Sequence, residues 1–269
     1  MVDKPKYFII EKEGPIIIWK YHNPPKNLMT IESMAEYAHL LDELDKDDSL
    51  RVGIFTSALS NVFIQHFDVS QLVTMGQALK QNKDTAPQPE PRPAYRPGPK
   101  VTIAAINAPL AGGGLELALA CDFRFMSRTA YAGQSEVMVG ILAGGGGTQR
   151  MPRLIGLNKA LEIQLTGRLI LADEAERIGL ITKACDPQDL MPQAIALAKQ
   201  IAAQPPLAVS YIRKAIYEGM SMPLVDGLML ESQLFWELVA SEDAMRLMKY
   251  YVEGGQDTEP FLTGKQPPA

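Results

Sequence analysis

The sequence predicts an α/β protein in which strands and helices alternate over the first two thirds of the 269 residues and helices alone follow. Short apolar runs rich in β-branched residues, such as Val101–Ile106, alternate with segments of helical periodicity as far as about residue 184. From residue 188 to about 253 every periodic segment has helical spacing. Alternation of this kind is typical of a sheet with helical crossovers.

The N-terminal elements follow from local signals. Tyr7–Glu11 and Ile16–Tyr21 are short apolar runs separated by a Gly-Pro turn, which predicts a β-hairpin. Thr30 is suited to cap a helix whose apolar positions recur at helical spacing up to about residue 44. Val52–Thr56 has the composition of a buried strand.

A second helix and a proline-rich segment come next. Asp68 and Gln71 have the spacing of a capping box for a helix that continues to about residue 79. Between residues 85 and 99 six prolines alternate with other residues, which excludes a helix and favours an extended, semi-rigid loop. This segment is either a surface linker or a cover for a site opening. The remaining predicted elements are helices over 158–166 and 172–179, a strand over 180–184, and helices over 188–203, 207–219, 224–240 and 242–251.

Composition excludes several functions. The net charge of −5 and the pI near 5.3 provide no diffuse basic surface, so we expect no nucleic-acid partner. Cys121 and Cys185 are the only cysteines and are expected to be buried free thiols, and with three histidines no cluster has metal-ligand spacing. The N-terminus lacks the apolar core of a signal peptide and no stretch approaches a membrane span. We therefore expect a cytoplasmic protein with no metal and no membrane partner.

The chemistry-bearing residues lie between 101 and 150. The Val101–Ile106 strand leads through a turn to three glycines, 112–114, and then to a helix made of good helix formers. This order presents free backbone N–H groups to a ligand. Glu116 lies in the first turn of the helix, and Glu136 follows shortly before a second glycine run, 144–147. Either carboxylate alone has a plain explanation, as a helix-dipole partner or a loop residue. Together they indicate acid–base chemistry next to an oxyanion site.

Three blocks in this region carry a resemblance to a known family. Residues 107–122, 133–136 and 144–150 resemble, in this order, signatures of the enoyl-CoA hydratase/isomerase (crotonase) family. The resemblance implies a crotonase-like spiral of β-β-α units, with an α/β catalytic core over residues 1–200. It also implies an all-helical C-terminal region, residues 201–269, that forms homotrimers, often paired into hexamers.

The resemblance also implies a reaction. In the hydratases of the family, the glutamates that match Glu116 and Glu136 hold a water molecule and move its protons. Backbone N–H groups at the positions of Gly113 and Phe67 stabilise the thioester oxygen, and Gly144 matches a position close to the water. The expected function is a lyase of fatty acid metabolism that adds water to an enoyl-CoA thioester or removes it. No cofactor is permanently bound, and coenzyme A enters as part of the acyl-CoA substrate.

Three alternatives to hydration remain open. The chain could be an enoyl-CoA isomerase, could catalyse another crotonase-type reaction such as C–C cleavage, or could be a non-catalytic oligomeric relative. Both glutamates are present, whereas some family isomerases lack one at the position of Glu116, and this favours hydratase chemistry.

The candidate substrate-binding residues include a departure from the family pattern. Many relatives carry Phe-Cys/Ser-Ala-Gly-Ala-Asp where this chain has Phe63-Ile-Gln-His-Phe-Asp68. His66 is either an additional acid–base group, because histidine exchanges protons near neutral pH, or a packed loop residue. Lys26 is either a contact for a coenzyme A phosphate or a solvated lysine. The full candidate set is Lys26, Gln65, His66, Asp68, Gly112 and Gly144.

The segment after the oxyanion loop forms much of the acyl pocket wall in the resembled family. Here residues 68–100 are proline-rich in their second half, and Phe67 and Tyr95 offer aromatic surface. We therefore predict that the best substrate is not a straight short-chain enoyl-CoA. The alternative is that residues 85–99 lie outside and contact nothing.

Overall fold

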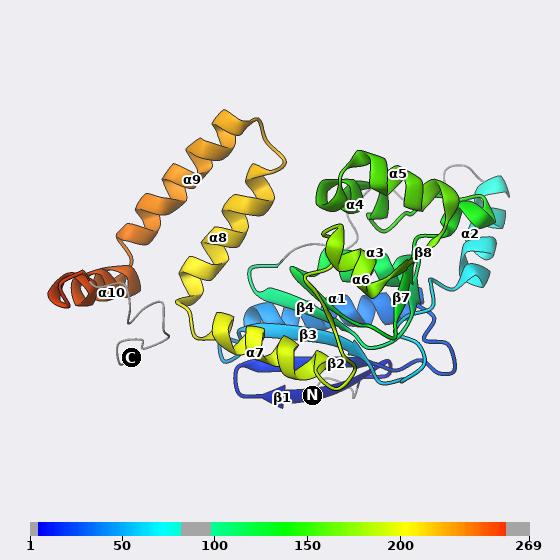
Figure 1. Cartoon of the computed structure of the whole chain (residues 1–269), viewed down its shortest axis with the longest axis horizontal. Helices are drawn as coiled ribbons and strands as arrows, with labels where there is room; N and C mark the ends of the chain where they lie inside the picture. The colour runs from blue at the N-terminus through cyan, green and yellow to red at the C-terminus, as the bar shows by residue number, and fades with distance from the viewer. Residues whose placement is uncertain (1–4, 82–97, 257–269) are drawn as a thin grey trace. The chain divides into compact units, whose positions relative to one another are not determined.

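A computed structural model describes residues 5–81 and 98–256 (Figure 1). The chain divides into two compact units, residues 1–202 and 203–269. The α/β class with helices at the C-terminal end is confirmed. Tyr95 and nearly all of the proline-rich segment lie outside the described residues, so the two interpretations of that segment both stay predictions.

The first unit is built on a six-stranded sheet. Its strand order is β1 (Phe8–Glu13), β2 (Ile16–Tyr21), β3 (Val52–Ser57), β4 (Val101–Ile106), β6 (Phe123–Ser127) and β9 (Lys183–Cys185). β1 and β2 form the predicted antiparallel hairpin, and all other neighbours are parallel. Parallel strands are covered on both faces, which explains why β3 and β4 are buried along their whole length.

Two helices pack against this sheet. In α1 (Ile31–Lys46), Thr30 caps the N-terminus as predicted, by accepting from the Ser33 N–H. Tyr37 of α1 meets Trp19 and Phe55 in edge-to-face contacts at ring-centroid distances of 5.7 and 5.1 Å. The second helix, α7 (Leu190–Ala202), lies along the central strands (Figure 1). The core is therefore aromatic on the α1 side of the sheet.

A second, three-stranded sheet was not predicted. It joins β5 (Leu110–Ala111), β7 (Tyr131–Gly133) and β8 (Leu169–Leu171), which are too short to show a period. The predicted strand over 180–184 is also wrong in its bounds, because β9 begins only at Lys183. Leu180 is instead tied back to the preceding helix by its N–H, which donates to Ala175 O at 2.8 Å, and Gly179 has a φ of +81°.

The remaining helices of the first unit connect these strands. They are α2 (Val69–Gln81), α3 (Gly113–Ala120), the 3₁₀ turn η3 (Glu136–Val139), α4 (Gly147–Ile155), α5 (Leu157–Thr166) and α6 (Ala172–Arg177). The capping box predicted for α2 is wrong. Asp68 Oδ1 accepts from Ser70, but the Gln71 side chain accepts from the Ile31 N–H, and Asp68 N donates to Met29 O. Gln71 therefore links α2 to the start of α1.

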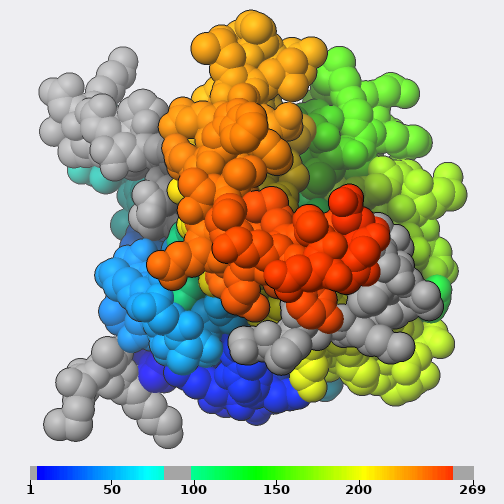
Figure 2. Space-filling model, turned by 90° about the vertical axis from the view of Figure 1, so that its left-hand side faces the viewer, coloured from blue at the N-terminus to red at the C-terminus, as the bar shows by residue number. Residues whose placement is uncertain are grey.

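The second unit contains α8 (Pro206–Gly219), α9 (Leu224–Val239) and α10 (Glu242–Glu253). α8 and α9 pack on each other where Gly219 and Gly227 meet, and a Cβ added to Gly227 would lie 3.4 Å from the Gly219 Cα. Figure 2 shows the surface of α9 and α10 in orange and red. Apolar side chains are abundant on it, with Leu224 79% and Trp236 65% exposed. Within the described part of the chain, no helix combines the length and apolarity that a membrane crossing needs.

Candidate active site

Glu116 is a buried carboxylate, 4% exposed, in the first turn of α3. Its Oε1 accepts hydrogen bonds from the N–H groups of Gly145 and Gly147, at 2.7 and 2.8 Å. Both donors belong to the second glycine run, and Gly147 begins α4. Hydrogen bonds to a carboxylate at a helix N-terminus favour its ionised form. The N-terminus of α4 therefore binds the Glu116 side chain through the Gly147 N–H.

Glu136 is the second carboxylate, and it lies half-buried at the start of η3. Its Oε1 accepts from the Gln134 side-chain amide at 2.8 Å. Its Oε2 is buried and has no hydrogen-bond partner among the described residues, and the same is true of Gln134 Oε1. A buried acceptor without a partner costs about 1–3 kcal/mol, so this oxygen is suited to a water molecule or a substrate proton.

Glu136 and Glu116 lie at two different glycine turns, and Gln134 links the two. A Cβ on Gly112 would lie 3.2 Å from Glu136 Oε1, and Gly112 has a φ of +52° that other residues rarely adopt. A Cβ on Gly147 would lie 2.9 Å from Gln134 Oε1, while the Gly147 N–H binds Glu116. The glycines thus leave space for Glu136 beside one turn and for Gln134 beside the turn that binds Glu116.

The loop before α2 brings Phe67 next to Gly113. A Cβ on Gly113 would lie 3.6 Å from the Phe67 Cβ. Met29 pairs with the loop on one side, since Met29 N donates to His66 O and Asp68 N donates to Met29 O. In an extended strand the N–H and C=O of one residue point to the same edge, so those of Phe67 point away from Met29. The Gly113 N–H, in the first turn of α3, has no acceptor within the helix.

The other candidate residues lie in different settings. Gln65 and His66 are half-buried in the loop beside the Gly112 turn. Asp68 caps α2, and the hydrogen bond from the Ser70 hydroxyl lowers the pKa of its carboxyl. Lys26 is exposed in the turn after β2. Gly144 is exposed, with nothing within 4 Å of an added Cβ. A direct substrate contact stays a prediction for each of them.

Sequence reasoning missed the groups that hold these residues in place. Gly145 and Gly147 act through backbone N–H groups, and Gln134 was passed over inside a recognised block. Asn27 is fully buried, and its amide donates to Ser57 Oγ at 2.8 Å and to Phe63 O at 3.0 Å. A buried amide two residues before Met29 therefore ties the turn after β2 to the loop of residues 63–68. The only feature of the sequence that could have indicated this role is the position of Asn27 directly after a Pro-Pro-Lys turn.

A cavity of about 260 Å³ adjoins the Glu136 carboxylate. Gln134 and Glu136 form part of its wall, and the rest is mostly apolar. Those other lining residues are Val137, Ile141, Leu142, Ala143, Thr148, Pro152, Leu157, Ala160, Leu161, Gln164 and Leu165.

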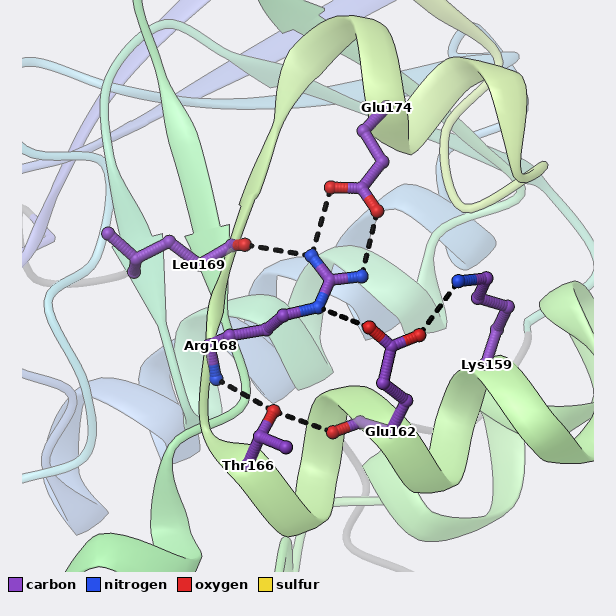
Figure 3. A network of polar contacts seen from close by, with 6 residues as sticks. All are labelled: Lys159, Glu162, Thr166, Arg168, Leu169 and Glu174. Carbon is purple, nitrogen blue, oxygen red and sulfur yellow. Dashed lines mark hydrogen bonds and ion pairs between the residues drawn. The ribbon is translucent and has the colours of Figure 1, made fainter.

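A charged network outside the cavity anchors α5, which supplies one wall (Figure 3). The Arg168 guanidinium lies between Glu162 of α5 and Glu174 of α6, with contacts of 2.8 and 2.7 Å. Lys159 adds a third contact, to Glu162 at 2.7 Å. The bidentate pairing with Arg168 lowers the pKa of the Glu174 carboxyl.

The two cysteines have no part in this arrangement. Cys121 and Cys185 are free and buried, as predicted, and burial raises the pKa of the Cys121 thiol to about 12. Over residues 5–81 and 98–256, no cluster of three or more His, Cys, Asp or Glu residues has the geometry of a metal site.

The fold and its central strand–glycine–helix unit define a crotonase-type α/β enzyme. The family model described as enoyl-CoA hydratase/isomerase matches residues 11–258. The chain therefore belongs to the enoyl-CoA hydratase/isomerase family, and the resemblance seen in the sequence is confirmed.

Curated relatives and solved structures agree with this family. The chain is 33% identical over 246 residues to a short-chain-enoyl-CoA hydratase of Clostridium acetobutylicum, covering 91% of this chain and 94% of that protein. It is 35% identical over 229 residues to the (E)-benzylidenesuccinyl-CoA hydratase of Thauera aromatica, covering 84% and 88%. The crystal structure of an enoyl-CoA hydratase from Bacillus anthracis superposes with a TM-score of 0.82 at 28% identity, covering 93% and 97%.

Proposed function

We propose that this protein adds water reversibly to the double bond of an enoyl-CoA thioester, with Glu116 and Glu136 as its acid–base pair. The observation that carries the proposal is a chain of contacts between the two carboxylates: two N–H groups of the second glycine run anchor Glu116, and Gln134, which lies against Gly147, donates to Glu136. Support also comes from relatives named as hydratases, including a crotonyl-CoA hydratase of Syntrophomonas wolfei that is 32% identical.

The two carboxylates have different partners, which suggests different roles. Two N–H groups stabilise the ionised form of Glu116, so we assign to it the removal of a proton from water. The water oxygen then bonds to Cβ, and the double-bond electrons move toward Cα and the thioester oxygen. Glu136, whose Oε2 has no partner among the described residues, starts the cycle with a proton and delivers it to Cα. The proton that Glu116 took from water then returns to Glu136 through solvent, which resets the pair. In dehydration every step runs in reverse.

Negative charge develops on the thioester oxygen during this addition. We propose that the N–H groups of Phe67 and Gly113 receive that oxygen, because the two residues adjoin and neither N–H is directed into the pairing with Met29 or the helix. A preorganised donor of this kind contributes about 3 kcal/mol to the stability of the transition state. Their backbone role explains how phenylalanine can replace the small residue of many relatives.

The acyl chain beyond Cβ is proposed to extend into the 260 Å³ cavity, because Glu136 lines it and most other lining residues are apolar. An apolar cavity beside Glu136 supports the prediction that the best substrate is not a straight short-chain enoyl-CoA. Purified protein is incubated with crotonyl, branched and aromatic enoyl-CoA thioesters, and loss of the conjugated absorbance gives kcat/KM for each. Absence of hydration with every thioester would refute the function. A clear preference for crotonyl-CoA would refute only the acyl assignment.

Two substitutions localise the acyl chain. Leu161→Trp fills the cavity from α5, so we expect kcat/KM to fall for bulky thioesters and to change little for crotonyl-CoA. Ile9→Trp on β1, 47% exposed and outside the cavity lining, is the matched control. Equal behaviour of the two variants would place the acyl chain elsewhere.

A further inference from the structure

The loop that carries the Phe67 N–H contains a histidine where many members of the family have glycine. On one edge this loop is held by Met29, through hydrogen bonds of 2.9 Å to His66 O and 2.7 Å from Asp68 N. The opposite edge presents both the N–H and the C=O of Phe67. The Phe67 N–H, which can donate to an oxyanion, therefore lies beside the Phe67 C=O, which would repel an oxyanion.

The imidazole of His66 is in contact with that carbonyl. His66 Nδ1 lies 2.7 Å from Phe67 O. A carbonyl oxygen can only accept a hydrogen bond, so Nδ1 must carry the proton and Nε2 of the neutral ring is then an acceptor. The contact thus defines the tautomer of this histidine without reference to any ligand.

We propose that His66 is a positioning residue for the oxyanion site: its Nδ1–H binds Phe67 O, which fixes the Phe67 N–H and screens the negative charge of the neighbouring carbonyl. This inference rests on the proposed function. Without a donor on it, the partial negative charge of Phe67 O would oppose the charge that develops on the thioester oxygen beside it. With the donor in place, residues 66–68 are held on both edges, by Met29 and by the imidazole.

The Cβ of His66 packs against the Gly112 turn. A Cβ on Gly112 would lie 3.5 Å from the His66 Cβ and 3.2 Å from Glu136 Oε1. The histidine therefore packs at the turn where Glu136 also lies, and the φ of +52° and the closeness of Glu136 Oε1 favour glycine at 112.

The tautomer is the first test. The protein contains three histidines, so ¹⁵N-histidine labelling gives a simple long-range ¹H–¹⁵N spectrum at a pH where the rings are neutral. His66→Asn removes one signal set and so assigns it. We expect the Nδ1–H pattern for His66, and an Nε2–H pattern would overturn the proposal. Because no turnover is needed, the result is independent of whether the protein hydrates enoyl-CoA.

Substitutions provide the second test. Asparagine can place an amide N–H at the position of Nδ1, whereas glutamine extends its amide one carbon further. Since one oxyanion donor is worth about 10²–10³-fold in kcat, we expect His66→Ala to lower kcat roughly 10–100-fold with KM within about threefold. His66→Asn should recover at least about tenfold of that loss and His66→Gln much less. His39→Ala, exposed on α1 and paired with Glu43, is the control for removal of a histidine.

A spectroscopic measurement distinguishes positioning from a purely structural role. The C=O stretch of a ¹³C-labelled, unreactive acyl-CoA thioester bound to the protein reports polarisation by the two donors. We expect a smaller shift to low frequency in His66→Ala than in wild type, and recovery in His66→Asn. Wild-type kcat and wild-type stretch in His66→Ala would overturn the proposal, as would equal defects in all three variants. If wild type shows the shift but hydrates nothing, the proposed function fails while the role of His66 is still decided.

Discussion

Replacing Glu116 by glutamine and by alanine separates the chemical role of this carboxylate from its structural one. Its Oε1 accepts two hydrogen bonds, from Gly145 at 2.7 Å and Gly147 at 2.8 Å, and both glycines are buried. Glutamine keeps an acceptor oxygen of the same reach but loses the charge. Alanine removes the acceptor and leaves both N–H groups without it.

The magnitudes differ for the two substitutions. A hydrogen bond to a charged group contributes about 1.5–3 kcal/mol, and one to a neutral group about 0.5–1.5 kcal/mol. Weakening two such bonds in Glu116→Gln should lower the free energy of unfolding by about 2 kcal/mol, and part of this loss is offset because the variant no longer buries a charge. Glu116→Ala strands two buried donors at about 1–3 kcal/mol each, or about 2–6 kcal/mol in all. At roughly 2–4 °C per kcal/mol, alanine should lower Tm by at least about 4 °C. In activity, loss of an acid–base group costs about 10²-fold or more for both variants.

Hydration of the best enoyl-CoA thioester and thermal unfolding are measured on the same preparations. Glu36→Gln is the matched control, because Glu36 also accepts two backbone N–H groups, from Lys6 and Tyr7, but lies on α1. It should lose stability and keep its kcat. Near-wild-type turnover in Glu116→Gln would refute the two-carboxylate mechanism. Loss of activity in strict proportion to loss of folded protein would refute a chemical role.

Four further outcomes are expected. Glu136→Gln should lower kcat by about 10²-fold or more while thioester binding, measured by calorimetry, survives; binding lost in parallel with turnover would contradict this. The apolar surface of α8 to α10 should be buried between subunits, so light scattering at micromolar concentration should give a trimer or hexamer, and a monomer would contradict it. Cys121 should resist alkylation at pH 8 in the folded protein and react in denaturant, because burial raises its pKa to about 12 and the thiol stays protonated. Asn27→Ala should lower the free energy of unfolding by about 2–4 kcal/mol, because its buried hydrogen-bond partners lose their donor. It should also lower kcat by displacing the loop of residues 63–68, and unchanged stability with unchanged kcat would contradict both expectations.

Most of the main sheet and the long helices could be predicted from the sequence because their signals are local. Val101–Ile106 is apolar throughout, as a strand covered on both faces must be, and the predicted bounds are those observed. Thr30 precedes a run of helical period and caps α1. The small sheet escaped prediction because β5 and β7 have two and three residues, and their pairing depends on contacts between distant parts of the chain.

The candidate site was predictable in its acidic side chains but not in what holds them. Glu116 is a charged residue in an otherwise apolar helical segment, so it can be recognised as a candidate from the sequence alone. The donors that anchor it are backbone groups of Gly145 and Gly147, which the sequence shows only as a run of four equivalent glycines. Which of the four would reach the carboxylate depends on where α4 begins, and helix boundaries are the least certain part of a pattern.

The loop of residues 63–68 shows how a hydrogen bond between distant parts of the chain escapes sequence reasoning, although no residue in it is unusual. Asn27 contributes no charge and belongs to no periodic segment, yet its amide reaches Phe63 O across the chain. Two residues later Met29 pairs with the loop, and the edge left over presents the Phe67 N–H. The same pairing brings the Phe67 carbonyl to that edge, where His66 meets it. A glycine at position 66 could not supply that donor, so the departure from the family pattern coincides with an added hydrogen bond at the site.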